Sequence, residues 1–223
     1  MSNENHQNLS SVDVVKETLE KIGDVYFPLL IINLPDLVFS LIEGFSEVSY
    51  LLVISVILSL WYTATGYIYY HKVLNEQNIT IGRAFKASLS KIGNVLIAII
   101  IISLIVFIGF LLFIIPGIYI ANRLYLTLYV IVIENCSVIQ GIKRSWELTK
   151  GHSRFIFLTL GQVIGIPILI VWIVFLIIFR DVETVENITN LLGSVIRYLW
   201  SPILFVSITL VYNRLIASYK SAK

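Results

Sequence analysis

The sequence predicts an all-α, polytopic membrane protein, and three observations support that prediction. Only 13% of the 223 residues are charged and 57% are hydrophobic, whereas about one quarter of an ordinary soluble domain is charged. The mean hydropathy of the chain is +0.88. No Asp, Glu, Lys or Arg occurs in residues 48–70, 92–121 and 155–179. Each stretch is long enough to cross the hydrocarbon layer, which takes roughly 20 apolar residues in a helix.

These stretches predict helices rather than barrel strands. In lipid every backbone amide needs a partner within the span, and barrel strands are shorter and alternate in polarity. The pattern along the whole chain predicts six transmembrane helices, at residues 25–42, 48–70, 93–115, 118–133, 155–179 and 188–211. We expect a disordered polar N-terminus at residues 1–9, a single membrane domain at 10–217 and a cytoplasmic tail at 218–223.

Pro116 and Gly117 separate the third and fourth spans. Proline lacks an amide donor and glycine tolerates positive φ, so this dipeptide suits a tight turn. The alternative is one long kinked helix, but about 40 nearly uncharged residues at 1.5 Å per residue would exceed the bilayer roughly twofold. We therefore predict a hairpin that turns at Pro116 and Gly117.

The basic residues predict the orientation of the spans. Thirteen of the 16 Lys and Arg residues fall on one face of the predicted arrangement, and basic residues are retained on the cytoplasmic side. Both termini are therefore expected in the cytoplasm, with the chain in a prokaryotic cytoplasmic membrane. The formal net charge of +2 is too small to indicate a nucleic-acid partner.

Three similar segments precede the odd-numbered spans, at residues 10–23, 80–93 and 137–151. Each opens with Ser or Thr, closes near Gly and carries an apolar stripe at helical spacing. Such basic amphipathic helices can lie in the headgroup plane, although the stripes suit packing against the protein's own spans equally well. The expected architecture is three units, each a surface helix followed by a transmembrane hairpin. The basic residues expected to face lipid are Arg83, Lys86, Lys91, Lys143, Arg144 and Lys150.

One part of the sequence resembles a known membrane module. It contains Pro-Gly-Ile-Tyr-Ile-Ala-Asn-Arg from Pro116, Val-Ile-Glu ending at Glu134, and Gly-Ile-Lys-Arg-Ser-Trp-Glu-Leu-Thr-Lys-Gly from Gly141. This stretch resembles the membrane domain of bacterial glycerophosphoryl diester phosphodiesterases and related stand-alone multi-pass proteins of unknown function. The resemblance implies a six-helix membrane module. It does not imply phosphodiesterase activity, because that chemistry belongs to a separate soluble barrel that no segment here supplies.

The sequence offers no constellation for catalysis. His6, His71 and His152 have no second ligand at helical spacing, and metal-assisted hydrolysis needs several ligands at one site. Cys136 is the single cysteine, so no intrachain disulfide or Cys-based metal site is expected. No phosphate-binding or dinucleotide fingerprint is present. We therefore expect a non-catalytic protein with no cofactor and no bound metal.

Polar residues inside the spans give a sharper signal, because a charge in hydrocarbon costs at least about 2.5 kcal/mol and usually has a partner. Asp36 in span one and Arg123 in span four lie at similar predicted depths, and could pair. One interpretation is a polar cavity or ion path, with Asn33, Asn122 and Gln162 as lining residues. The other is a buried pair that fixes the register of the two spans, which we favour.

Our leading functional hypothesis is a protein that engages membrane lipid or a protein partner through its basic surface helices. The alternative is a small transporter or channel around Asp36 and Arg123. Transporters often use inverted repeats, whereas these repeats run in one direction, which weakens that alternative. The Gly-x-x-x-Gly motif at Gly161 and Gly165 suits close helix packing, either within the chain or in a homo-oligomer.

Overall fold

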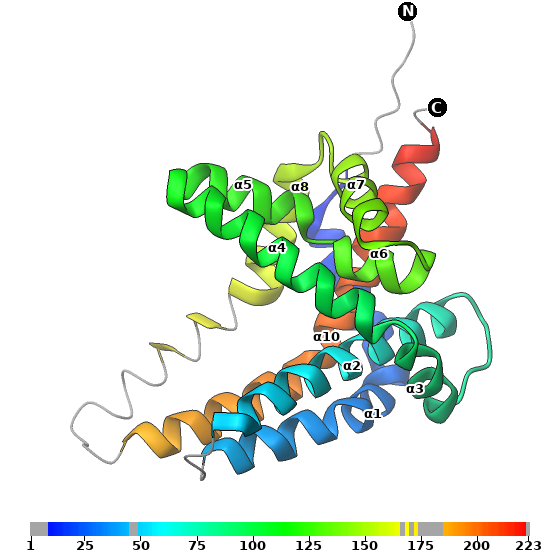
Figure 1. The fold of residues 1–223 in the computed structure, drawn as a ribbon. Helices are drawn as coiled ribbons and strands as arrows, with labels where there is room; N and C mark the ends of the chain where they lie inside the picture. Colours follow the sequence, from blue (N-terminus) through cyan, green and yellow to red (C-terminus); the bar gives the residue numbers. More distant parts are fainter. Residues whose placement is uncertain (1–8, 45–48, 166–167, 170–171, 174–184, 222–223) are drawn as a thin grey trace, which may run out of the picture.

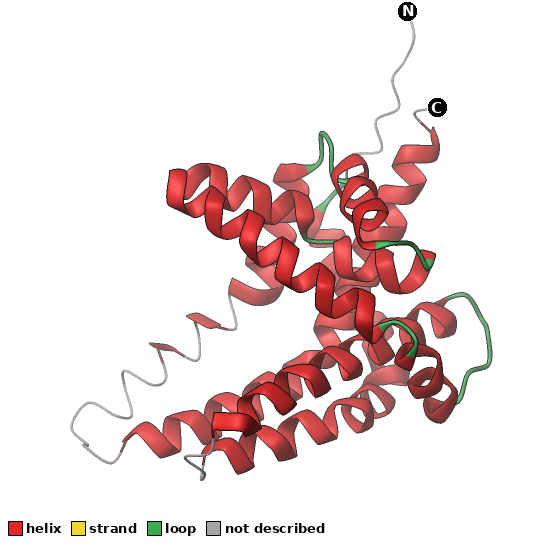
Figure 2. Cartoon of the chain, in the orientation of Figure 1, coloured by secondary structure: helices red, strands yellow, loops and turns green. Residues whose placement is uncertain are grey.

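The computed structural model describes residues 9–44, 49–165, 168–169, 172–173 and 185–221, with side chains except at 36, 40–44, 49–53 and 185–192. In this part of the chain every regular element is helical (Figure 2). The elements are α1 (Ser11–Gly44), α2 (Ser49–Leu74), α3 (Ile81–Leu89), α4 (Ile92–Leu112), α5 (Ile114–Leu124), α6 (Thr127–Glu134), α7 (Val138–Leu148), α8 (Ser153–Leu160), the π-helical η1 (Gly161–Gly165) and α10 (Val185–Ser221).

Three described segments are long and apolar enough to cross a membrane: Ile92–Leu112, Ile114–Glu134 and Gly193–Ser221. A shorter apolar segment, Ser153–Gly165, extends through α8 and η1. Residues 166–167, 170–171 and 174–179 of predicted span five lie outside the described residues. The chain is thus an all-helical protein with helices suited to spanning a membrane.

The helices form two arms that meet in a common core (Figure 1). In one arm α1 packs along both α10 and α2, and in the other α4 packs against α5. Aromatic side chains fill the place where the arms meet. The Tyr129 ring lies 4.8 Å from that of Tyr212 and 5.1 Å from that of Tyr67, between centroids. Tyr70 is also buried there.

The hairpin between α4 and α5 turns earlier than the sequence predicted. Phe113 is the extended residue between the helices, with φ −166° and ψ 158°. Pro116 and Gly117 lie in the first turn of α5 instead. Proline is tolerated there because the first amides of a helix have no partner within it. Gly117 allows the helices to approach closely, since a Cβ at this position would lie 2.9 Å from the backbone nitrogen of Phe110.

The predicted starts of the surface segments are correct, but two of the three predicted ends are wrong. Thr80 caps α3 by accepting from the Arg83 amide, and Ser137 forms a capping box with Gln140 at α7. Gly151, with φ +82°, lies just beyond α7. By contrast, Gly93 lies inside α4.

Gly23 also lies in the interior of a helix, because α1 runs without a break from Ser11 to Gly44. The first surface segment is therefore fused to the first span. An ion pair between Glu17 and Lys21, one turn apart at 2.9 Å, supports helix through this region. The last helix is also longer than predicted, since α10 continues to Ser221 and includes the start of the predicted tail at residue 218.

Candidate functional site

The three surface segments bury equivalent positions. Positions are numbered here by how many residues they follow the capping residue, which is Ser10, Thr80 or Ser137. The fourth and eighth positions are buried in each segment: Val14 and Thr18, Ala84 and Ser88, and Gly141 and Ser145. Positions four residues apart lie on one helix face. Five of these six side chains are small or carry a hydroxyl, so this inner face can approach another helix closely.

The hydroxyl group at the eighth position contacts another helix in every segment. The contacts are Thr18 Oγ1 to Ser207 Oγ at 3.2 Å, Ser88 Oγ to Thr65 Oγ1 at 2.7 Å, and Ser145 Oγ to the Arg123 carbonyl oxygen at 2.9 Å. The second and third segments thus contact helices that come before them in the chain, α2 and α5. The first segment contacts α10, the last helix of the chain, so the three units close into a ring.

The outer face of the segments also repeats. The ninth position carries a large apolar side chain that remains exposed: Leu19 at 60%, Leu89 at 58% and Trp146 at 39%. The sixth position carries an exposed lysine in each segment: Lys16, Lys86 and Lys143. Residues three apart are neighbours on a helix surface. Each segment therefore presents one lysine beside one large apolar side chain.

The six basic residues predicted to face lipid divide into two groups. Four are exposed: Arg83, Lys86, Lys143 and Lys150. The other two make contacts within the protein. Lys91 Nζ donates to Asn135 Oδ1. Arg144 Nε lies 3.2 Å from Glu134 Oε1, and its guanidinium carbon lies 4.9 Å from the centroid of the Tyr219 ring.

Arg123 is buried beneath α7, with 2% of its surface exposed. Its guanidinium carbon lies 4.8 Å from the Trp146 ring centroid and 5.9 Å from that of Tyr119. Its Nε has no hydrogen-bond partner, and no acidic side chain that the structure describes forms an ion pair with it. Aromatic rings are therefore the described partners of this cation.

The side chain of Asp36 lies outside the described residues, so its pairing with Arg123 stays a prediction. Asn33 Nδ2 donates to the Leu29 carbonyl of its own helix. Asn122 Nδ2 donates to the Ser153 carbonyl at 2.7 Å, which ties α5 to α8. Gln162 Oε1 is buried without a hydrogen-bond partner.

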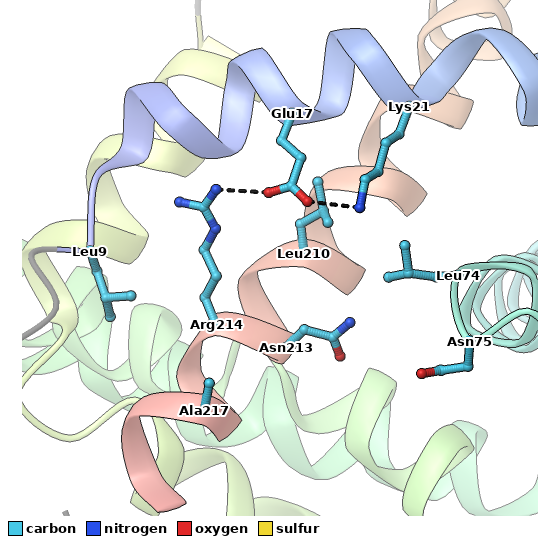
Figure 3. A pocket seen from close by; sticks show the side chains of 9 residues that line it. All are labelled: Leu9, Glu17, Lys21, Leu74, Asn75, Leu210, Asn213, Arg214 and Ala217. Atoms are coloured by element: carbon cyan, nitrogen blue, oxygen red, sulfur yellow. Dashed lines mark hydrogen bonds and ion pairs between the residues drawn. The ribbon is translucent and has the colours of Figure 1, made fainter. Parts of the chain in front are cut away.

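A cavity of about 600 Å³ lies between the start of α1, the end of α2 and the end of α10 (Figure 3). Its lining residues are Leu9, Glu17, Lys21, Leu74, Asn75, Leu210, Asn213, Arg214 and Ala217. None of the predicted lining residues Asn33, Asn122 and Gln162 belongs to it. The cavity was not predicted from the sequence, although the Glu17–Lys21 spacing and the position of Arg214 just after span six were visible.

The charges of the cavity form a small network. Glu17 accepts from Arg214 Nη2 at 2.8 Å and pairs with Lys21 Nζ at 2.9 Å. Partial burial of the Glu17 carboxylate acts to raise its pKa. The hydrogen bonds and charges of Lys21 and Arg214 outweigh that effect, so the pKa lies below its usual value. Glu17 is therefore ionised at neutral pH, and one carboxylate lies between two cations.

Hydrogen bonds also link two tyrosines of the core to His71 and Glu134. His71 Nδ1 and Tyr129 Oη lie 2.9 Å apart, and Tyr212 Oη donates to Glu134 Oε1 at 2.8 Å. Among the described residues, no group of three or more His, Cys, Asp or Glu side chains could hold a metal ion. The two hydrogen bonds therefore link α6 to α2 and to α10.

No curated protein and no solved structure matches the chain. A protein-family model does match, over residues 42–213, which includes most of the chain. That family is described only as uncharacterised, which agrees with the resemblance to multi-pass proteins of unknown function. It gives no link to the phosphodiesterases. The chain belongs to the uncharacterised protein family UPF0259.

Proposed function

We propose that this protein is a non-catalytic, six-span membrane protein that binds anionic lipid of the cytoplasmic leaflet through its three surface segments. One observation carries the proposal: all three segments expose a lysine and a large apolar side chain at the same two positions. A basic amphipathic helix in the headgroup plane presents this combination of side chains to the membrane. The ring arrangement places such a pair on each of the three units.

The contacts of the inner face fix the orientation of each segment, and this orientation leaves the outer face available to lipid. The buried fourth and eighth positions, such as Gly141 and Ser145, already hold the segment against a span. The ninth position lies about 100° further around the helix than the eighth. Leu19 and Leu89 are therefore turned away from the span that holds their segment. The Trp146 ring lies over Arg123 of α5, but 39% of its surface remains exposed. The acyl boundary can cover these exposed surfaces.

The energies support selective retention of anionic lipid. Each basic residue near an anionic surface contributes roughly 1 kcal/mol, and full burial of a leucine side chain contributes roughly 1.5–3 kcal/mol. The four exposed basic residues of the second and third segments thus supply a few kcal/mol, and the three apolar side chains supply a similar amount. The electrostatic part should weaken with added salt.

The central test is lipid retention by the purified protein, measured by native mass spectrometry. Replacing Arg83, Lys86, Lys143 and Lys150 with Gln should reduce bound anionic lipid. Replacing Leu19, Leu89 and Trp146 with Ser should reduce bound lipid of every headgroup. Equal retention by all variants would remove the basis of the lipid proposal, and the same face would then be a docking surface for a protein partner.

A charge-matched control separates position from net charge. Changing Lys72, Arg154, Arg197 and Lys220 to Gln removes the same number of positive charges outside the three segments. We expect this control to retain much more anionic lipid than the variant within the segments. Similar losses in the two variants would mean that net charge, and not the segments, attracts lipid.

The six-span topology can be tested by cysteine labelling in a Cys136→Ser background. External reagent should modify a cysteine placed at Glu47 or Glu183 but not one at Glu76 or Lys220, because basic residues gather on the cytoplasmic face. Labelling at Glu76 in intact cells would reverse the proposed orientation and place the three segments outside.

A second candidate, a small transporter or channel, is favoured by one observation. Arg123 is buried and its Nε lacks a hydrogen-bond partner, and intramembrane cations commonly mark transport paths. This candidate predicts ion or solute flux in proteoliposomes that Arg123→Gln abolishes. Lipid binding through the surface segments would be unchanged in that variant.

A further inference from the structure

We propose that the cavity between α1, α2 and α10 binds a phosphate group, held by Arg214 and Lys21. This inference rests on the proposed lipid function and deepens it, because it adds a defined headgroup site to the surface segments. The ligand chemistry is an oxyanion attached to a partly apolar molecule. Its source is either an anionic phospholipid of the surrounding leaflet or a soluble phosphate compound.

The charge of the cavity favours an anion. Glu17 neutralises one of the two cations that it contacts, at 2.9 Å and 2.8 Å, and the cluster keeps one positive charge. Both cations also retain free donors. A lysine ammonium has three N–H donors and an arginine guanidinium has five, and Glu17 occupies one on each. Arg214 Nη1 makes a further, longer contact of 3.4 Å to the Ser10 carbonyl.

The neutral part of the lining suits a bound headgroup. Asn75 and Asn213 bring side-chain amides from α2 and α10, and Figure 3 shows both beside the cavity. Leu9, Leu74 and Leu210 supply apolar surface at separate places around the cavity (Figure 3). A volume of about 600 Å³ is within the range of cavities that hold small molecules. The cations can thus bind a phosphate while the leucines contact the carbon atoms attached to it.

The position of the cavity connects it to the proposed lipid surface. Lys21 lies two residues beyond Leu19, the exposed apolar side chain of the first segment, so the two differ by only about 3 Å in position along the helix axis although they are on opposite faces of α1. The cavity therefore lies at the depth of the lipid headgroups that the first segment would contact. The segments would attract lipid without a fixed stoichiometry, whereas the cavity would hold one molecule.

Two variants alter the cavity in different ways. Lys21→Gln removes a cation without disturbing the Glu17–Arg214 ion pair. Ala217→Trp leaves every charge in place and fills the space with an indole ring. Because Ala217 is exposed, the second change can be made without overpacking the core. The matched control for charge is Arg154→Gln, because Arg154 is an exposed basic residue of α8 that lies outside both the surface segments and the cavity lining.

The test measures binding to the full-length protein in neutral detergent, with three probes: short-chain phosphatidylglycerol, the matching phosphatidylcholine and inorganic phosphate. We expect one tightly bound phosphatidylglycerol per chain, with affinity at least tenfold lower in Lys21→Gln and in Ala217→Trp. Arg154→Gln should match the wild type. Competition by inorganic phosphate at similar concentration would identify a soluble phosphate as the ligand, and failure to compete would identify the lipid.

Unchanged phosphatidylglycerol affinity in both cavity variants would overturn the inference. The proposed function fails separately, when the four-Gln variant of the surface segments retains as much anionic lipid as the wild type. Loss of lipid in the four-Gln variant, with normal binding in the cavity variants, would keep the surface and discard the cavity. Equal binding of phosphatidylcholine and phosphatidylglycerol would also overturn the inference of a phosphate site in the cavity, because a site with net positive charge must prefer the anion.

Discussion

The helices α4 and α7 show two opposite relations between apolarity and burial. α4 has 21 residues and buries three of them, Val95, Ala98 and Gly109. α7 has 11 residues and buries four, although it carries several charges. The more apolar helix is thus the less buried one. In this chain apolarity indicates contact with lipid, whereas small and hydroxyl-bearing side chains at helical spacing indicate contact between helices.

The largest effect is expected at Arg123, below α7. If Asp36 is its partner, Asp36→Ala or Arg123→Ala alone should destabilise by about 3–5 kcal/mol, because each leaves an unpaired buried charge. The double variant should lose less than the sum of the two. Thermal unfolding in detergent measures this. Additive losses would show that the two charges do not meet, and a parallel cycle of Arg123→Ala with Trp146→Ala would then reveal the coupling with the ring.

The next effect concerns glycine at the contact between α6 and α7. A Cβ at Gly141 would lie 2.4 Å from Ile131 Cγ1, whereas a Cβ at Gly82 in α3 would have nothing within 4 Å. Gly141→Ala should therefore destabilise by about 1–3 kcal/mol through overpacking. Gly82→Ala should stabilise by up to about 1 kcal/mol through helix propensity. Equal shifts of the unfolding midpoint would contradict the close contact at α7.

Removing single hydroxyl groups should distinguish buried from lipid-facing positions. Ser88→Ala takes away the 2.7 Å contact with Thr65 and should cost about 1 kcal/mol. Ser103→Ala in α4 changes an exposed side chain, so the free energy of unfolding should hardly change. A loss at Ser103 as large as that at Ser88 would mean that α4 also packs against protein.

The smallest effect is expected from removing the ion pairs of Glu17. These pairs are partly exposed, and exposed pairs contribute about 0–1 kcal/mol to the free energy of unfolding. A carboxyl group with a lowered folded-state pKa adds stability above its usual pKa and loses it as the pH falls through the folded value. Glu17→Gln should therefore lower the unfolding midpoint at pH 7. The difference from the wild type should fade below pH 4.5, the usual pKa of this group. A difference that persists at lower pH would exclude this ion pair as its cause.

Local chemistry was predictable from the sequence, and long-range contacts were not. The caps at Thr80 and Ser137 followed from residue type and spacing. The turn at Pro116 was misplaced by three residues, because proline fits the first turn of a helix as well as it fits a loop. Gly23 was a weak stop signal, since a glycine lowers helix propensity by only about 1 kcal/mol and α1 continues through it.

The cavity and the inner faces of the segments were difficult to predict from the sequence, for different reasons. The cavity combines α1 with α10, and only the folded chain brings Glu17 and Arg214 together. The inner faces did have a signal, because small residues recur four apart at Ala84 and Ser88 and again at Gly141 and Ser145. The side chains of the neighbouring apolar stripe are larger, and the sequence-based prediction used that stripe to assign the contact face.

The closed ring has a consequence for the order in which the protein can be completed during synthesis. Thr18 contacts Ser207, which lies 189 residues later in the chain. At about 5–20 residues per second, a ribosome needs on the order of ten to forty seconds to make that interval. Throughout this time Thr18 lacks its contact with Ser207, while the two later segments can each settle on a helix that has already emerged. The first segment made is therefore the last to complete its contacts, and a chain stalled before α10 leaves the Thr18 hydroxyl without this partner.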